Sequence, residues 1–171
     1  MYVLLSYMMS SMIQTGMIDL IPLWLWSDKD LGGLEYSQQK IGMLMLISAL
    51  STAVVQQFVY SWVTARIGYR KTYLLGSVLG IPAFICLPLI SKLLFFDETL
   101  VFVLLFLFYN LQEFSMFFVQ VSVFVMINNS CNSYNRGKVH GMAMSAASIA
   151  KCLAPFIISN MFAWSTNTNS F

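Results

Sequence analysis

Long runs of hydrophobic residues alternate with short polar stretches along the whole chain. A membrane-spanning helix needs roughly 20 mostly apolar residues to cross a hydrocarbon core of about 30 Å. Five runs meet this length, at residues 3–26, 41–63, 72–91, 100–127 and 141–164. None of them shows the strict two-residue alternation of a membrane β-barrel strand. The pattern therefore predicts an all-α membrane protein with five transmembrane helices in a single domain.

The composition supports a lipid environment and excludes several other classes of protein. Of the 171 residues, 58% are hydrophobic and 9% are charged, whereas soluble domains carry roughly 25% charged residues. A net charge of +2 is too small for a nucleic-acid-binding surface. The three cysteines have no CxxC spacing and the chain has a single histidine, so we expect no metal site and no cofactor. The lipid bilayer is the partner that the composition indicates.

Basic residues between the hydrophobic runs predict how the chain is oriented in the membrane. On one side, the loops after the second and fourth runs contain Arg66, Arg70, Lys71, Arg136 and Lys138. On the other side, the loops contain Lys29, Lys40 and Lys92. Because cytoplasmic loops are enriched in Lys and Arg, we expect the first set in the cytoplasm, with the N-terminus inside and the C-terminus outside. The plasma membrane and the membrane of a vacuole-like organelle both remain open.

Three ionisable residues interrupt the hydrophobic runs: Asp19, Glu113 and Lys151. A charge at the bilayer centre costs at least ~2.5–3.5 kcal/mol, so each of them is a candidate for a substrate or proton pathway. Glu113 and Lys151 lie near the middle of their spans and can pair if their helices face each other. Such a pair would either couple transport or be an inert structural contact. Asp19 lies one turn before Pro22, nearer the outer end of its span.

Amide side chains add to this candidate pathway, at Gln14, Gln56, Gln57 and Asn110. They can line an aqueous path, or they can bond across helices, where each hydrogen bond contributes roughly 0.6 kcal/mol. The third run contains no ionisable or amide side chain, but it has Gly76 and Gly80 at a spacing that favours close helix packing.

The turn between the second and third runs carries a motif. Residues 61–71 read Ser-Trp-Val-Thr-Ala-Arg-Ile-Gly-Tyr-Arg-Lys. This stretch resembles the G-x-x-x-D-R-x-G-R-R signature of the major facilitator superfamily, in the form found in the second half of those transporters. The matching positions are Arg66, Gly68 and Arg70, with Lys71 adjacent. Ser61 and Ala65 replace the first glycine and the acidic residue of the signature.

Two further stretches resemble the zinc-induced-facilitator-like transporters of that superfamily. Residues 21–24, 32–37 and 41–42 look like the segment that opens the second half of those proteins, with Asp19 in the place of an acidic residue. Residues 128–130 and the second cytoplasmic loop with Arg136 and Gly137, followed by Lys151, look like the family's run into the penultimate helix. The resemblance covers residues 16–164.

The resemblance implies the seventh to eleventh helices of a twelve-helix transporter, which is a partial C-terminal six-helix half without the N-terminal half and the last helix. It implies transport of an unknown small solute, in an antiporter-like manner. Proton coupling is favoured because Asp19 and Glu113 are the titratable carboxylates within spans. The alternative is a non-transporting truncated relative that acts as a membrane partner or is inactive. We do not expect an enzyme, because no nucleophile–base set or phosphate-binding loop is present in the sequence.

Overall fold

The computed structural model describes residues 2–90, 98–131 and 134–167. Within these ranges the chain forms helices joined by short connections, and no strand occurs, which confirms the predicted all-α class. The elements are α1 (Tyr2–Trp26), the 3₁₀ turn η1 (Lys29–Leu31), α2 (Gln38–Val55), the π-helical turn η2 (Gln56–Tyr60), α3 (Ser61–Ile67), α4 (Tyr69–Leu89), α5 (Glu98–Asn129) and α6 (Arg136–Asn167). Lys92, and Ser91 at the end of the third predicted span, lie outside the described residues.

Four helical segments of the described chain are both long enough and apolar enough to cross a membrane. They are Gln38–Ile67, which joins α2, η2 and α3, followed by Tyr69–Leu89, Glu98–Asn129 and Arg136–Ser165. The chain is therefore a multi-pass membrane protein. Helix α1 has 25 residues, about 37 Å at 1.5 Å per residue, but it is not one of these four segments. It contains the polar residues Ser6, Ser10, Ser11, Gln14, Thr15 and Asp19. A membrane crossing by α1 stays a prediction.

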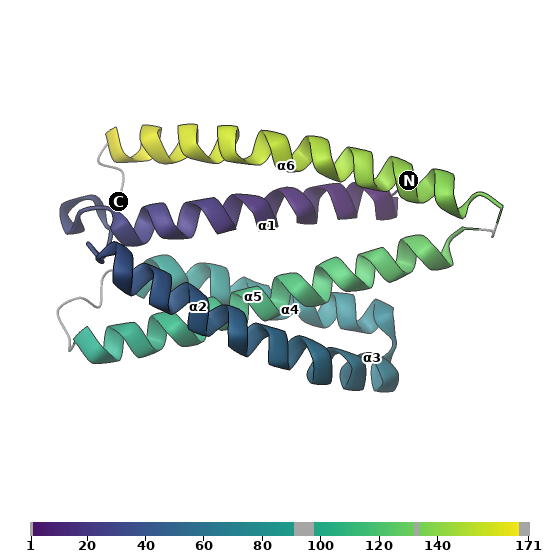
Figure 1. The fold of residues 1–171 in the computed structure, drawn as a ribbon, viewed down its shortest axis with the longest axis horizontal. Coiled ribbons are helices and arrows are strands. Elements are labelled where there is room, and N and C mark those ends of the chain that lie inside the picture. The colour runs from purple at the N-terminus through teal and green to yellow at the C-terminus, as the bar shows by residue number, and fades with distance from the viewer. Residues whose placement is uncertain (1, 91–97, 132–133, 168–171) are drawn as a thin grey trace.

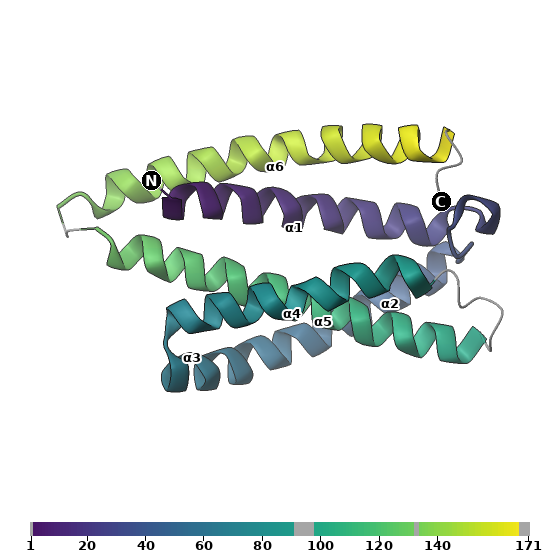
Figure 2. The ribbon, with the colours of Figure 1, turned by 180° about the vertical axis from the view of Figure 1, so that it is seen from behind.

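The helices associate in pairs around α5. Figures 1 and 2 show α1 and α6 side by side, with α4 along α5, and the segment α2–α3 crossing α5 on the side away from α4. Small residues allow the close approaches. A Cβ atom on Gly76 would lie 2.8 Å from the Cβ of Phe118 on α5, and Ser115 of α5 donates a hydrogen bond from Oγ to the Gly76 carbonyl at 2.8 Å. The predicted packing role of Gly76 is confirmed.

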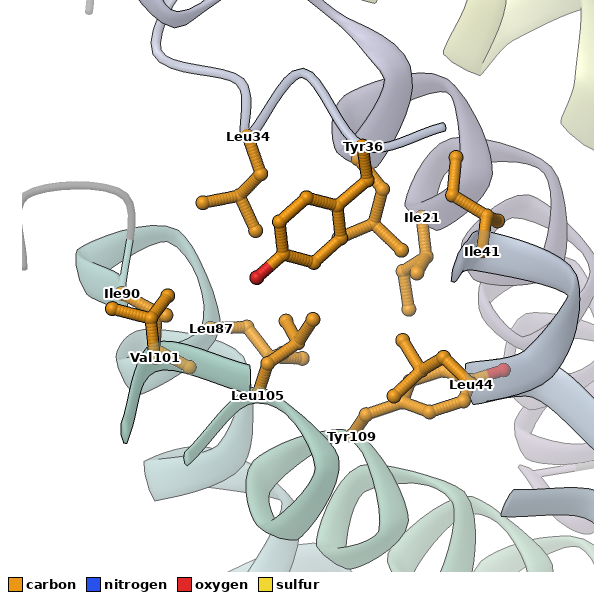
Figure 3. Packing of buried hydrophobic residues seen from close by; sticks show 11 residues of the cluster. Ile21, Leu34, Tyr36, Ile41, Leu44, Leu87, Ile90, Val101, Leu105 and Tyr109 are labelled. Carbon is orange, nitrogen blue, oxygen red and sulfur yellow. The ribbon is translucent and has the colours of Figure 1, made fainter. Parts of the chain in front are cut away.

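One end of the bundle is sealed by the connection between α1 and α2. Leu34 and Tyr36 of this connection are 1% and 5% exposed, and they insert among apolar residues of α1, α2, α4 and α5 (Figure 3). Trp24 Nε1 donates a hydrogen bond to the Gly32 carbonyl at 3.0 Å, and an ion pair joins Lys40 of α2 to Glu98 of α5. Together these contacts hold the first turns of α2 and α5 close to the end of α1.

Tyr36 places its phenol inside this apolar cluster. Within the described part of the chain, its buried hydroxyl has no hydrogen-bond partner. Because burial favours the neutral form, it raises the pKa of the Tyr36 phenol. The aromatic ring therefore contributes packing, while the hydroxyl carries a desolvation cost that no hydrogen bond within the described ranges offsets.

The predicted cytoplasmic loops share the opposite end of the bundle. The turn between α3 and α4 and the start of α6 both lie at this end, which is also the end at which α1 begins (Figure 1). Gly68 has a φ of 77°, a backbone conformation that glycine adopts without steric cost. Arg66 lies over the ring of Trp62, 4.0 Å from its centroid, while Arg70 and Lys71 are exposed, as are Arg136 and Gly137 on α6.

Candidate functional site

Polar side chains of α5 bind it to three neighbouring helices. Asn110 Nδ2 donates to Ser48 Oγ of α2 at 3.1 Å, and Ser51 Oγ donates to Asn110 Oδ1 at 2.8 Å. Asn110 is itself buried. Of the two roles that the sequence left open for this amide, the structure shows the bond across helices.

A second amide of α5 makes the corresponding contact with α1. Gln120 Oε1 accepts a hydrogen bond from Ser10 Oγ at 2.8 Å, and Gln120 Nε2 donates to Ser11 Oγ at 2.8 Å. This contact was not predicted from the sequence. Neither was Gln112, which is 1% exposed and whose Oε1 atom has no partner among the described residues. The available signal was the same as for Asn110, an amide within a hydrophobic run.

A polar cavity of about 240 Å³ lies between α2 and α5, and we call it the α2–α5 cavity. The residues that line it are Met45, Ser48, Ala49, Thr52, Ala53, Gln56, Tyr109 and Glu113. Two of the sequence-predicted pathway residues, Gln56 and Glu113, thus meet at one place. Glu113 is partly buried. Thr52 is 7% exposed, and within the described chain its Oγ1 atom has no hydrogen-bond partner.

The π-helical turn η2 sets which residues of the second span face α5. A π turn bonds residue i to i+5 and thus accommodates an extra residue. Gln56 at its start lines the α2–α5 cavity, and Tyr60 at its end packs against Phe117 and Phe118 with ring centroids 5.5 and 5.6 Å apart. Such turns occur frequently at functional sites. Gln57, the other candidate amide in this turn, is exposed.

Glu113 and Lys151 do not form the ion pair that the sequence suggested, although the structure describes both residues. Glu113 lies on the side of α5 that meets α2. Helix α6 packs mainly against α1 through a stripe of buried alanines at positions 143, 147, 150 and 154. Lys151 lies at the edge of this stripe, rotated by about 100° from Ala150 and about 40° from Ala147 at 3.6 residues per turn, and it is exposed. Helices α5 and α6 contact each other near Phe124 and His140, about three helical turns away from Glu113 and Lys151, so a shared depth does not bring the charges together.

The remaining candidates lie on α1, where Asp19 and Gln14 are both partly buried. Neither residue lines the α2–α5 cavity. Two ion pairs occur among the described residues, Lys29 with Glu35 and Lys40 with Glu98, so Asp19 is not in one. In the same part of the chain, no three His, Cys, Asp or Glu side chains are grouped as a metal ion would require.

The fold and the polar groups along α5 define a helical, multi-pass membrane protein. Comparison with curated proteins identifies three transporter-type relatives in Arabidopsis thaliana. The chain is 29% identical over 164 residues to a probable peptide/nitrate transporter, 26% identical over 162 residues to the protein Zinc Induced Facilitator 1, and 24% identical over 162 residues to the protein Zinc Induced Facilitator-Like 1. These matches cover 95–96% of this chain and 33% of each relative.

The matches confirm the resemblance to the zinc-induced-facilitator-like transporters of the major facilitator superfamily. The chain spans about a third of the length of these relatives. No family model matches it, and no solved structure matches it.

Proposed function

We propose that this chain forms part of a secondary transporter of the major facilitator type, which moves a small solute across a membrane. The support is its similarity to transporters along nearly its whole length, together with a polar cavity inside membrane-length helices. In this proposal α1 also crosses the membrane, as the first of five spans. The five spans α1, α2–α3, α4, α5 and α6 are then the seventh to eleventh helices of the complete transporter. The missing N-terminal half and last helix complete the solute path.

Protons drive the transport, and Glu113 carries them. Its carboxyl group lies in the α2–α5 cavity next to the polar side chains of Thr52 and Gln56. Because a charge within the bilayer is costly, a carboxyl group in such a place exchanges its proton when water or solute enters. Asp19, one turn before Pro22, is the second carboxylate of this pathway. Lys151 acts independently of Glu113 and faces the part of the transporter outside this chain.

The basic turn at residues 66–71 lies on the cytoplasmic side in this proposal, as does the start of α6. The connection of Leu34 and Tyr36 then closes the bundle at the outer side. Solute reaches the α2–α5 cavity from the cytoplasmic end.

Flux measurements on the complete transporter in proteoliposomes test the proposal. The name of the first relative suggests nitrate and a labelled dipeptide as solutes, and the names of the others suggest zinc ions as a third. We expect a pH gradient to drive uptake of at least one solute, and Glu113→Gln to abolish that uptake while exchange at equal pH continues.

The matched control is Glu35→Gln, which alters an exposed carboxylate outside the spans and should leave uptake unchanged. Gradient-driven uptake that is intact in Glu113→Gln would contradict the role of this carboxylate. Absence of flux for every solute tested would favour the alternative, a non-transporting relative.

A further inference from the structure

We propose that the α2–α5 cavity binds a small organic ammonium group. This inference deepens the proposed function, on which it rests, by naming the chemical class of the solute group that is held at Glu113. It depends on three observations: a carboxyl group in the cavity with no cationic side chain beside it, an unpartnered buried hydroxyl in the wall, and a mixed polar and apolar lining.

The cavity contains a carboxyl group, and no cationic side chain lines the cavity to balance its charge when it is ionised. Its eight lining residues include one carboxylate, that of Glu113, and no Lys, Arg or His. Among the described residues, the ion pairs lie elsewhere, at Lys29–Glu35 and Lys40–Glu98. A charge in a low-dielectric environment requires a partner. A cationic group in the cavity supplies this partner.

The other polar atoms of the wall are also suited to accept hydrogen bonds from a cation. Thr52 is 7% exposed, and its Oγ1 atom has no partner within the described chain, although a buried hydroxyl normally has one. Gln56 adds an amide oxygen on the next turn of the same helix face, and Ser48 adds a hydroxyl one turn earlier. An ammonium group has up to three N–H donors, which the Glu113 carboxylate and these oxygens can accept.

The rest of the lining favours an organic cation over a metal ion. Met45, Ala49 and Ala53 give the cavity an apolar side, and Tyr109 gives it an aromatic ring. Aromatic rings attract ammonium groups through their quadrupole. Ca²⁺, by contrast, takes six to eight oxygen ligands, and the described chain has no group of three metal-ligating side chains. The volume of about 240 Å³ is below the ~300–1,000 Å³ typical of complete ligand sites, so it fits one amine-bearing part of a solute.

Binding of radiolabelled ethylammonium to the complete protein in detergent tests the inference. We expect saturable binding that unlabelled methylammonium chloride, which keeps three N–H donors, displaces more strongly than potassium chloride at equal ionic strength. Glu113→Gln should weaken binding at least tenfold. Thr52→Val should weaken it about tenfold because it removes one hydrogen bond to a charged group, and Thr52→Ser should restore it. The exposed control Glu35→Gln should bind as the wild type does.

Thr52→Val keeps the test valid if Glu113→Gln fails to fold. The Thr52 hydroxyl has no partner within the described chain, so its removal costs the fold no hydrogen bond. The inference is overturned if ethylammonium shows no saturable binding, if both Thr52→Val and Glu113→Gln bind it as the wild type does, or if potassium displaces it equally well. Ammonium binding without flux of any solute would support this site and contradict the proposed transport. Flux without ammonium binding would support the proposed transport and contradict this site.

Discussion

Replacement of Gly76 by alanine tests the contact between α4 and α5, which positions α5 and its polar side chains. An added Cβ atom would lie 2.8 Å from the Cβ of Phe118, 3.0 Å from the carbonyl oxygen of Ser115 and 3.2 Å from the backbone nitrogen of Val119. Two of these three atoms belong to the backbone of α5 and the third is attached directly to it. No side-chain rotation can relieve the overlap, so the two helices must move apart.

The change in the free energy of unfolding is the balance of two destabilising effects and one stabilising effect. Overpacking costs about 1–3 kcal/mol, and separation of the helices also weakens the hydrogen bond from Ser115 to the Gly76 carbonyl, a loss of roughly 0.6 kcal/mol in a membrane protein. In the opposite direction, alanine loses less backbone entropy on folding than glycine does, which stabilises the folded protein by about 0.5–1 kcal/mol. We therefore expect Gly76→Ala to lower the free energy of unfolding by about 1–3 kcal/mol.

Reversible unfolding by SDS titration in mixed micelles measures this change. The control is Gly141→Ala on α6, where no atom lies within 4 Å of the added Cβ and the entropy gain alone should raise stability by about 0.5–1 kcal/mol. The two substitutions are chemically identical and should have opposite signs. A Gly76→Ala variant as stable as the Gly141→Ala variant would refute the close α4–α5 contact.

Three further predictions concern other parts of the fold. Tyr36→Phe should raise the free energy of unfolding by about 1 kcal/mol, because it removes a buried hydroxyl that has no partner in the described chain; a loss of stability in the same titration would show that the hydroxyl is bonded. Asn110→Ala should cost about 1 kcal/mol through two interhelical bonds, whereas Asn160→Ala, whose amide bonds a carbonyl of its own helix, should cost less; equal losses would contradict the bridging role of Asn110. In a cysteine-free background, Tyr69→Cys should be protected from an impermeant thiol reagent added outside sealed cells; rapid labelling would invert the predicted orientation.

The helical architecture could be predicted from the sequence because the bilayer imposes a simple rule of length. Each hydrophobic run had to form a helix of at least 20 or so residues to satisfy its backbone. The same rule does not say which face of a helix meets which neighbour. Depth alone therefore suggested a pair between Glu113 and Lys151, which the alanine stripe of α6 and its packing on α1 prevent.

The site was predicted in part for the same reason. Glu113 and Gln56 are recognisable as polar residues within hydrophobic runs, and the structure brings them into one cavity. Thr52 could not be identified, because a threonine in a membrane helix usually bonds to its own backbone and gives no signal. The π-helical turn η2 follows no residue pattern in the sequence that distinguishes it from an α-helix. It coincides with the contact of Tyr60 with Phe117 and Phe118, which joins residues far apart in the sequence.

The central claim is that the α2–α5 cavity forms part of an aqueous path through the membrane. Thiol labelling of Gln56→Cys in the complete, otherwise cysteine-free protein tests it most directly, with Val54→Cys as the control. Gln56 lines the cavity, whereas Val54 is a 60% exposed apolar residue of the same helix that should face lipid. A charged, water-soluble reagent applied from the cytoplasmic side of membrane vesicles should modify Gln56→Cys and leave Val54→Cys unmodified. An unreactive Gln56→Cys, or equal reactivity at both positions, would contradict the claim.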